Sequence, residues 1–287
     1  MHPSPQNPSM TQLSEAQFKT IADLAYQEAG LVFPPSKAPL VRSRIIKRLR
    51  ALKIKSFEDY CSFISGQEGA NERRMMVSSL TTNISSFFRE PHHFEILRKD
   101  VLPPLLERAR QGQKIRIWSA GCSTGQEAYS IAITIAEMEP KLSSMDIRIL
   151  ASDIDPEVIR TGQEGFYRAN VISDVPENQL TKYFQPEEYN GKNGARVIPE
   201  IRSIVSFREL NLLGEWPMKR SFEIIFCRNV VIYFDAESKK RLWEKFNSST
   251  SPGGWLFIGH SERLPDDCHV DYIAAGPTVY RRPIEQH

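Results

Sequence analysis

Short apolar runs alternate with helical segments throughout the sequence beyond residue 112. The clearest runs are IRIW (115–118), IRILAS (147–152), FEIIFC (222–227) and WLFIG (255–259). Parallel strands are joined by crossover helices, so this alternation predicts an α/β domain with a mostly parallel sheet flanked by helices. The segment VYRRP (279–283) predicts an antiparallel strand at the edge of that sheet.

A different pattern precedes residue 90, where no segment alternates like a strand and four helices are predicted. Ser14 and Gln17 form a capping box at the start of the first helix, and Gly30 ends it. Residues 38–53 carry apolar side chains at helical spacing, and Asn71 is expected to cap the fourth helix.

These patterns predict three parts along the chain. A loose tail at residues 1–12 precedes a small all-helical domain at 13–90, and a larger α/β domain follows at 91–287. Between residues 165 and 207 the apolar runs shorten around the polar turn YNGKNG (189–194). We predict an inserted small β-subdomain there.

Composition excludes several classes of protein. The chain has 287 residues, of which 40% are hydrophobic. No run approaches the roughly 18 apolar residues of a spanning helix, and the N-terminus lacks the apolar core of a signal peptide. The four cysteines lie far apart without a CxxC motif, so neither a disulfide framework nor a metal site is expected. We expect a cytoplasmic protein without membrane insertion.

The net charge of +2 hides an uneven distribution. Residues 1–80 contain 11 basic and 7 acidic side chains, a net +4, so the remaining 207 residues carry −2. Residues 37–55 hold eight basic side chains and no acid. The basic arc of the predicted helix includes Arg42, Arg44, Lys47, Arg48 and Arg50. It is either a solvated face or a surface for an anionic partner.

The segment SAGCSTGQEAYSIAI (119–133) predicts a strand, a glycine-containing loop and a helix that begins near Gln126. One interpretation is a hydrolase, because GCSTG (121–125) matches G-x-S-x-G and Asp235 and His260 follow in the expected order. A hydrolase needs several strands before its nucleophile. Here the serine would follow the first strand, which disfavours this interpretation.

A second interpretation is a nicotinamide enzyme, but the third glycine of G-x-G-x-x-G is absent. Glu127 near the helix start would also repel a pyrophosphate. S-adenosylmethionine has no phosphate and carries an amine, so it tolerates this carboxylate. Asp153, which lies 28 residues beyond Gly125, is placed to accept the ribose hydroxyls or, alternatively, to cap the helix before Pro156. A Rossmann-like methyltransferase is the third interpretation.

Six segments then occur in order: TTNISSFFREPHHF (81–94), SAGCSTGQEAYSIAI (119–133), ASDIDPEVI (151–159), NLL (211–213), FCRNVVIYF (226–234) and GWLFIGHSE (254–262). Together they resemble the chemotaxis receptor methyltransferases, which use S-adenosylmethionine to esterify glutamates of bacterial chemoreceptors. The resemblance covers residues 14–282. It implies a Rossmann-like methyltransferase sheet, a helical N-terminal domain, an inserted β-subdomain and S-adenosylhomocysteine as product.

The resemblance also implies the site residues. At the cofactor it implies Asn83, Ser85, Arg89, Glu127, Asp153, Asn211, Leu212, Arg228 and Asn229. Arg89 and Tyr233 are implied at the methyl-transfer site. The chain departs from the family at Ile84, which replaces a common glutamate, and at Gln126 and Ala128.

This chemistry needs no catalytic histidine or cysteine. A glutamate with a reference pKa near 4.3 is already ionised at neutral pH and attacks a sulfonium methyl group without a general base. The enzyme supplies alignment and partial desolvation. Arg89 is expected to orient a carboxylate of the acceptor or of the cofactor, and Tyr233 to orient the acceptor.

The partner implied is the helical cytoplasmic part of a chemoreceptor, docked on the basic helix. In some family members the inserted subdomain also binds a receptor C-terminal peptide by strand addition. Nucleic-acid methylation is disfavoured, because Cys227-Arg228-Asn229 stands where amino methylases carry Pro-Pro-aromatic and no cysteine follows a proline. A cofactor-binding scaffold without activity is the non-enzymatic alternative. We expect a monomer without a metal ion.

Overall fold

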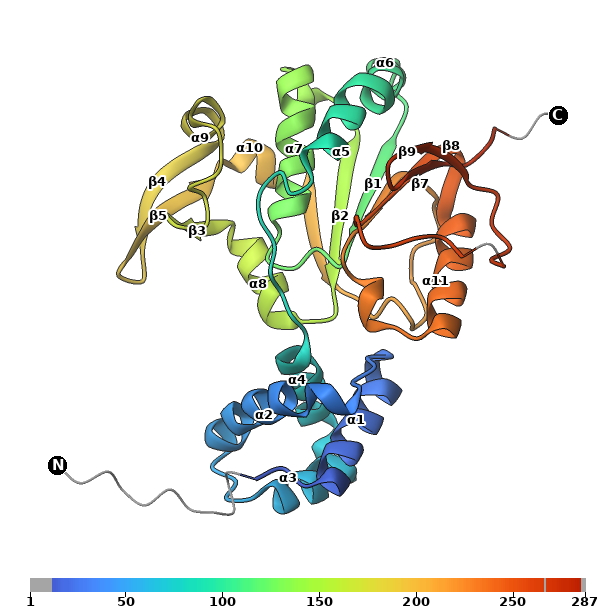
Figure 1. Cartoon of the computed structure of the whole chain (residues 1–287). Coiled ribbons are helices and arrows are strands. Elements are labelled where there is room, and N and C mark those ends of the chain that lie inside the picture. The colour runs from blue at the N-terminus through green and yellow to red at the C-terminus, as the bar shows by residue number, and fades with distance from the viewer. Residues whose placement is uncertain (1–11, 266, 285–287) are drawn as a thin grey trace. The chain divides into compact units, whose positions relative to one another are not determined.

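The computed structural model describes residues 12–265 and 267–284 (Figure 1). Apart from Gln12, the tail predicted at residues 1–12 lies outside this part of the chain. The chain divides into two compact units, one reaching to Thr82 and including Tyr233–Ser238, the other comprising Asn83–Ile232 and the chain from Lys239. Within the described ranges no helix is both long and apolar enough to cross a membrane.

The first unit is built from helices. They are α1 (Glu15–Ala29), α2 (Ala38–Leu52), α3 (Phe57–Ser65) and α4 (Ala70–Leu80), with the short turns η2 (Pro35–Lys37) and η3 (Gln67–Gly69). The predicted capping box is present, because Gln17 N–H donates to Ser14 Oγ and Ser14 N–H donates to Gln17 Oε1. Asn71 was wrongly predicted as a cap. Gly69 occupies that position, and Asn71 lies in the first turn of α4.

A buried carboxylate links three helices of this unit. Glu72, on α4, is 5% exposed and accepts a hydrogen bond from the Tyr60 hydroxyl at 2.8 Å. Arg48 donates to the same carboxylate through Nε at 2.9 Å and through a terminal nitrogen at 2.6 Å. Two parallel hydrogen bonds of this kind fix both partners in one geometry. Arg48 is therefore fixed at this carboxylate, with its side chain 19% exposed.

The second unit contains a seven-stranded sheet in the order β6-β2-β1-β7-β8-β10-β9. Its strands are β1 (Ile115–Ala120), β2 (Ile147–Asp153), β6 (Val205–Glu209), β7 (Phe222–Cys227), β8 (Thr250–Ile258), β9 (Ile273–Gly276) and β10 (Val279–Arg281). The first five strands in this order are parallel, and the four apolar runs form β1, β2, β7 and β8. The C-terminal strand is antiparallel as predicted but is not the edge, because β9 pairs outside it.

Helices cover both faces of this sheet. They are α5 (Pro91–Ile96), the π-helical turn η4 (Leu97–Val101), α6 (Leu102–Arg110), α7 (Gln126–Met138), α8 (Pro156–Glu164) and α11 (Ala236–Ser249). The short turns are η5 (Leu142–Ser144) and η6 (Val231–Tyr233), and η6 ends at a residue of the first unit. Ile117 packs in the cluster that contains residues of α6 and α7. The next residue, Trp118, points to the opposite face and contacts Phe246 of α11, with 5.3 Å between ring centroids. The alternation follows from the two-residue period of a strand.

The predicted insertion forms a separate small sheet, labelled β3, β4 and β5 in Figure 1. It contains β3 (Phe166–Arg168), α9 (Glu177–Tyr183), β4 (Phe184–Tyr189), β5 (Lys192–Val197) and α10 (Pro199–Arg202). The order is β3-β5-β4 with antiparallel pairing, so β4 is an edge strand. Asn190 and Gly191 both have positive φ, as a tight two-residue hairpin requires.

Replacing Arg48 with methionine removes the cation that pairs with the buried Glu72. We expect the free energy of unfolding of the helical unit to fall by about 3 kcal/mol, because a buried charge is left unpaired. Urea unfolding of the full chain, followed by circular dichroism, measures this change. Arg50→Met is the control, since Arg50 lies exposed on the same helix and should change stability by no more than about 0.5 kcal/mol. Equal losses in the two variants would contradict this account of the unit.

Candidate functional site

The loop between β1 and α7 turns sharply at three residues with positive φ. These are Gly121 at 80°, Ser123 at 51° and Gly125 at 95°. A Cβ on Gly125 would lie 2.9 Å from the Phe207 ring, so this position needs glycine for space as well as for conformation. The Ser123 hydroxyl donates to the Asn83 carbonyl at 3.0 Å, and His260 is paired elsewhere. Among the residues that the structure describes, Ser123 therefore has no histidine base, which argues against the hydrolase interpretation.

Two aspartates occupy the end of β2, and they have different partners. The Asp153 carboxylate accepts hydrogen bonds from Ser123 N–H at 2.8 Å and Asp155 N–H at 3.1 Å. Burial raises the pKa of Asp153 to about 6, although these hydrogen bonds oppose the shift.

The helix cap before Pro156 is Asp155, so the alternative role considered for Asp153 was wrong. Asp155 accepts from Glu157 N–H at 2.9 Å and from the Asn83 amide at 2.7 Å. Sequence reasoning missed Asp155, although an aspartate directly before a proline at the first helical position is a usual cap.

Arg228, at the end of β7, lies between two carboxylates. Its side chain is 2% exposed, with terminal nitrogens 3.3 Å from Glu127 Oε2 and 3.3 Å from Glu90 Oε2. It also donates to the Arg89 carbonyl. The Ser119 hydroxyl donates to the other Glu127 oxygen at 2.6 Å. The cluster of Glu90, Glu127 and Arg228 carries one net negative charge when all three are ionised.

The two carboxylates of this cluster respond differently to their surroundings. Burial raises the pKa of Glu127 even though the Arg228 charge opposes it. Burial would also raise the pKa of Glu90, but the Arg228 charge and hydrogen bonds from His260 lower it overall. Glu90 was not among the predicted site residues, and His260 was considered only within the disfavoured hydrolase interpretation.

The segment from Asn83 to Arg89 contacts the loop at Asn83 and then α7 and β3. The Phe88 N–H donates to Ser130 Oγ at 2.9 Å, and the buried Phe87 ring makes an edge contact with Tyr167. Arg89 is partly exposed and donates to the Ile84 carbonyl at 3.2 Å. Ile84 is 79% exposed, and Ser85 is half-buried.

The carboxyl ends of β2 and β6 bring the remaining predicted residues to the same edge. Glu209, the last residue of β6, is in register with Asp153, and Leu210 N–H donates to the Asp153 carbonyl at 2.8 Å. Asn211 Oδ1 accepts from Leu213 N–H, and Leu212 is buried. Parallel strands place the loops that follow them together at one edge, where ligands of such sheets bind.

Other predicted residues lie in the first unit. Tyr233 belongs there, and its carbonyl accepts from Val32 N–H at 2.9 Å. The Arg44 guanidinium donates to the Ser79 and Thr81 carbonyls at the end of α4. Arg44 and Arg48 are therefore paired within the unit, and the docking role predicted for them stays a prediction. Arg42, Lys47 and Arg50 are exposed on α2.

Within the described ranges one group of side chains has ligand atoms close enough to share a metal ion. It consists of Glu90, His92 and His93, whose atoms lie within 4.8 Å of one another. His93 is fully buried and its Nε2 lies 2.9 Å from Thr278 Oγ1. The Arg228 guanidinium already pairs with Glu90, and its charge disfavours a cation there. The absence of a metal ion stays a prediction.

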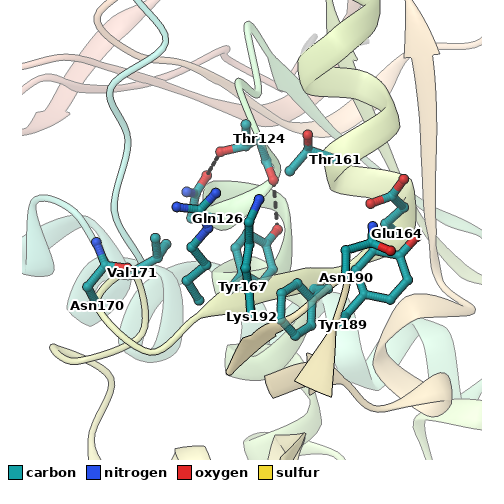
Figure 2. Close-up of a pocket in the computed structure, with 12 residues that line it drawn as sticks. Thr124, Gln126, Thr161, Glu164, Tyr167, Asn170, Val171, Tyr189, Asn190 and Lys192 are labelled. Atoms are coloured by element: carbon teal, nitrogen blue, oxygen red, sulfur yellow. Dashed lines mark hydrogen bonds between the residues drawn. The ribbon is translucent and has the colours of Figure 1, made fainter. Parts of the chain in front are cut away.

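A pocket of about 390 Å³ lies beside the loop, between α8 and the hairpin of the small sheet (Figure 2). Tyr167 closes one side by donating to the Thr124 carbonyl at 2.7 Å. Its lining comprises Thr124, Gln126, Thr161, Glu164, Phe166, Tyr167, Arg168, Asn170, Val171, Tyr189, Asn190 and Lys192. None of the residues predicted at the cofactor is among them.

Two family models match almost the whole chain. One is described as the all-alpha domain of CheR methyltransferase and matches residues 16–81. The other is described as the SAM binding domain of CheR methyltransferase and matches residues 83–279. The boundary between these matches coincides with the division of the units at Thr82 and Asn83, although the first unit also includes Tyr233–Ser238.

Two chemotaxis protein methyltransferases of known bacteria agree with these matches. A probable chemotaxis protein methyltransferase of Rhizobium etli is 42% identical over 258 residues, covering 90% of this chain and 96% of that protein. The chemotaxis protein methyltransferase of Escherichia coli is 36% identical over 271 residues, covering 93% of this chain and 91% of that protein. The solved structure of PKMT2 from Rickettsia typhi in complex with AdoHcy is 20% identical, covers 62% of this chain and 26% of that one, and gives a TM-score of 0.36.

The raised pKa of Asp153 predicts how the stability of the fold depends on pH. A carboxyl group with a folded pKa of about 6 instead of 3.8 binds its proton more tightly in the folded state. Its contribution to stability is therefore complete below pH ~4 and is lost as the pH rises through about 6, by an amount on the order of 2–3 kcal/mol. Asp153→Asn should flatten the stability profile between pH 4 and 7. Urea unfolding across this range tests it, and an unchanged slope in the variant would contradict the assignment.

Proposed function

Because the chain belongs to the CheR methyltransferase family, we propose that it transfers the methyl group of S-adenosylmethionine to glutamate carboxylates of chemoreceptors. The cofactor is S-adenosylmethionine, and the reaction leaves a glutamate methyl ester and S-adenosylhomocysteine. The relatives named above are chemotaxis methyltransferases, and they are covered over almost their whole length. We propose that the protein acts in the cytoplasm as a monomer during adaptation of the chemotaxis response.

One observation carries the proposal for the cofactor site. Glu90, Glu127 and Asp153 lie around the carboxyl ends of β1, β2 and β7, and Arg228 offsets one of their charges. The remaining negative charge suits a ligand that carries an ammonium and a sulfonium group. Glu127 is suited to the ammonium group, Asp153 to the ribose hydroxyls, and Asn211 and Leu212 to the adenine. Asn83, Ser85, Arg89, Arg228 and Asn229 complete the proposed set.

The cofactor supplies an electrophilic methyl group, so the protein needs to orient an acceptor that is already nucleophilic. A glutamate carboxylate is ionised at neutral pH, and its oxygen attacks without loss of a proton. Arg89 is partly exposed and donates only to a backbone carbonyl in the contacts described above, which leaves further donors for a carboxylate. We propose that Arg89 and Tyr233 orient the acceptor and do not activate it. Alignment of this kind supplies a large part of the rate.

The proposed docking surface consists of Arg42, Lys47 and Arg50 on α2. All three are exposed on this helix. Arg44 and Arg48 are less exposed and pair with groups of their own unit. Exposed cations accelerate encounter with an acidic partner and suppress binding of basic ones. The partner of matching chemistry is an acidic helical segment of a chemoreceptor.

The base stability of the transferred methyl group distinguishes a glutamate ester from a methylated amine or nucleobase. Incubation with tritiated-methyl cofactor and receptor-bearing membranes should label the receptor, and mild base should release the label as methanol. Esters hydrolyse in base, whereas methylated amines and nucleobases do not. Stable label would exclude glutamate esters, and binding of the cofactor without any label would favour a non-enzymatic scaffold.

Reversing the charge of the docking surface should slow methylation of intact receptor. For Lys47→Glu with Arg50→Glu we expect at least a tenfold slower rate at low ionic strength and a weaker dependence of that rate on salt, because the electrostatic contribution to encounter is lost.

Lys219→Glu with Arg220→Glu is the matched control. It changes the net charge equally through two exposed residues of the second unit. Similar rates for the two double variants would show that net charge, and not this surface, determines the encounter. Wild-type rates in the Lys47 and Arg50 variant would remove the docking proposal.

A further inference from the structure

Glu262 is a buried carboxylate that follows β8 and accepts hydrogen bonds from four backbone N–H groups. Glu262 is 2% exposed. One oxygen accepts from Asn229 at 3.1 Å and Gly259 at 2.6 Å, and the other accepts from Val230 at 2.9 Å and Val231 at 3.0 Å. Burial raises the pKa of Glu262, while these hydrogen bonds favour the charged form.

Three of the four donors belong to the loop that leaves β7 directly after Arg228. Asn229, the first residue of that loop, has a φ of 60°, a conformation that side-chain-bearing residues seldom adopt. Such a conformation persists only where the surroundings hold it. Glu262 bonds the backbone of Asn229 and of the two residues after it, so it fixes the path of the chain away from Arg228.

Gly259 shows how closely this loop approaches β8. A Cβ on Gly259 would lie 2.6 Å from the side-chain nitrogen Nδ2 of Asn229, 2.8 Å from the backbone nitrogen of Asn229 and 2.9 Å from Glu262 Oε2. The glycine therefore allows the loop to reach the carboxylate. Backbone N–H groups of the loop donate to Glu262, and the missing side chain of Gly259 leaves the space that the loop occupies.

We propose that Glu262 is a positioning residue for the cofactor. It acts through the backbone of residues 229–231 and sets the positions from which Arg228 and Asn229 contact the ligand. This inference rests on the proposed function, because it gives Arg228 and Asn229 a role at the cofactor. Groups that orient the ligand-contacting residues in this way commonly govern affinity as much as the contacts themselves do.

Glu223 provides a matched control at the opposite end of the same strand. It is 9% exposed, and its carboxylate accepts a hydrogen bond from Arg116 N–H at 2.7 Å. It lies at the start of β7, whereas Arg228 follows the end of β7. Glu223→Gln therefore removes a buried carboxylate that bonds backbone in the same unit but lies away from the loop.

The test compares the affinity of the full-length protein for S-adenosylhomocysteine, measured by titration calorimetry, with its thermal unfolding. Glu262→Gln replaces one acceptor oxygen by an NH2 group that faces backbone donors. We expect the Kd to rise by about tenfold or more. In the methylation assay the KM for the cofactor should rise similarly, with kcat at saturation close to that of the wild type. Glu262→Gln and Glu223→Gln should lower the Tm by similar amounts. Glu223→Gln should leave the Kd for S-adenosylhomocysteine unchanged.

Gly259→Ala is a second variant that keeps the carboxylate and displaces Asn229, and it should also weaken binding. The proposal is overturned if Glu262→Gln and Gly259→Ala bind with wild-type affinity, or if Glu223→Gln weakens binding as much as they do. Failure of the wild-type protein to bind the ligand would overturn the proposed function itself, and the inference with it. The wild-type titration therefore separates the two failures.

Discussion

The Arg228 guanidinium, buried between Glu90 and Glu127, is the interaction on which the site depends. It joins the end of β7, the start of α7 and the segment that precedes α5, three parts of the chain that are far apart in sequence. A buried ion pair adds little net stability, because desolvation opposes the attraction, but removal of one partner is costly. The cluster therefore specifies the arrangement of these segments more than it stabilises the fold. Its excess of carboxylate gives the cluster a net negative charge, which suits the cationic cofactor proposed to bind there.

Much of the fold could be predicted because it depends on local patterns. The runs that became β1, β2, β7 and β8 are apolar on both faces, as strands between two layers of helices must be. The strand β9 lacked such a pattern, because three of its four residues are exposed and pair on one side only. The cap of α4 was misplaced because a short turn, η3, shifts the start of that helix to Ala70.

The site was harder to predict, since its contacts join distant residues. The charges of Arg44 and Arg48 suggest an exposed arc, and only folding brings Glu72, 24 residues after Arg48, beside that arc. Asp155 had a local sign in the proline that follows it, whereas Glu262 had none. Its four donors lie at residue 259 and at residues 229–231, so only the folded loop shows its role. Most of the residues predicted at the cofactor followed from the resemblance, whereas the pattern of strand, loop and helix alone suggested only the loop, Glu127 and Asp153.

The edge strand β4 has a consequence for how the protein behaves in a crowded solution. An exposed strand edge offers unpaired backbone groups to any other extended chain and so invites aggregation. On β4, Pro186 has no N–H to offer, and Glu187 and Glu188 follow it directly. Arg196 holds the Glu187 carboxylate at 2.6 Å, which keeps that side chain beside the strand. The small sheet thus ends in a strand with one donor missing and two acidic side chains in sequence, a combination that discourages unwanted pairing between copies.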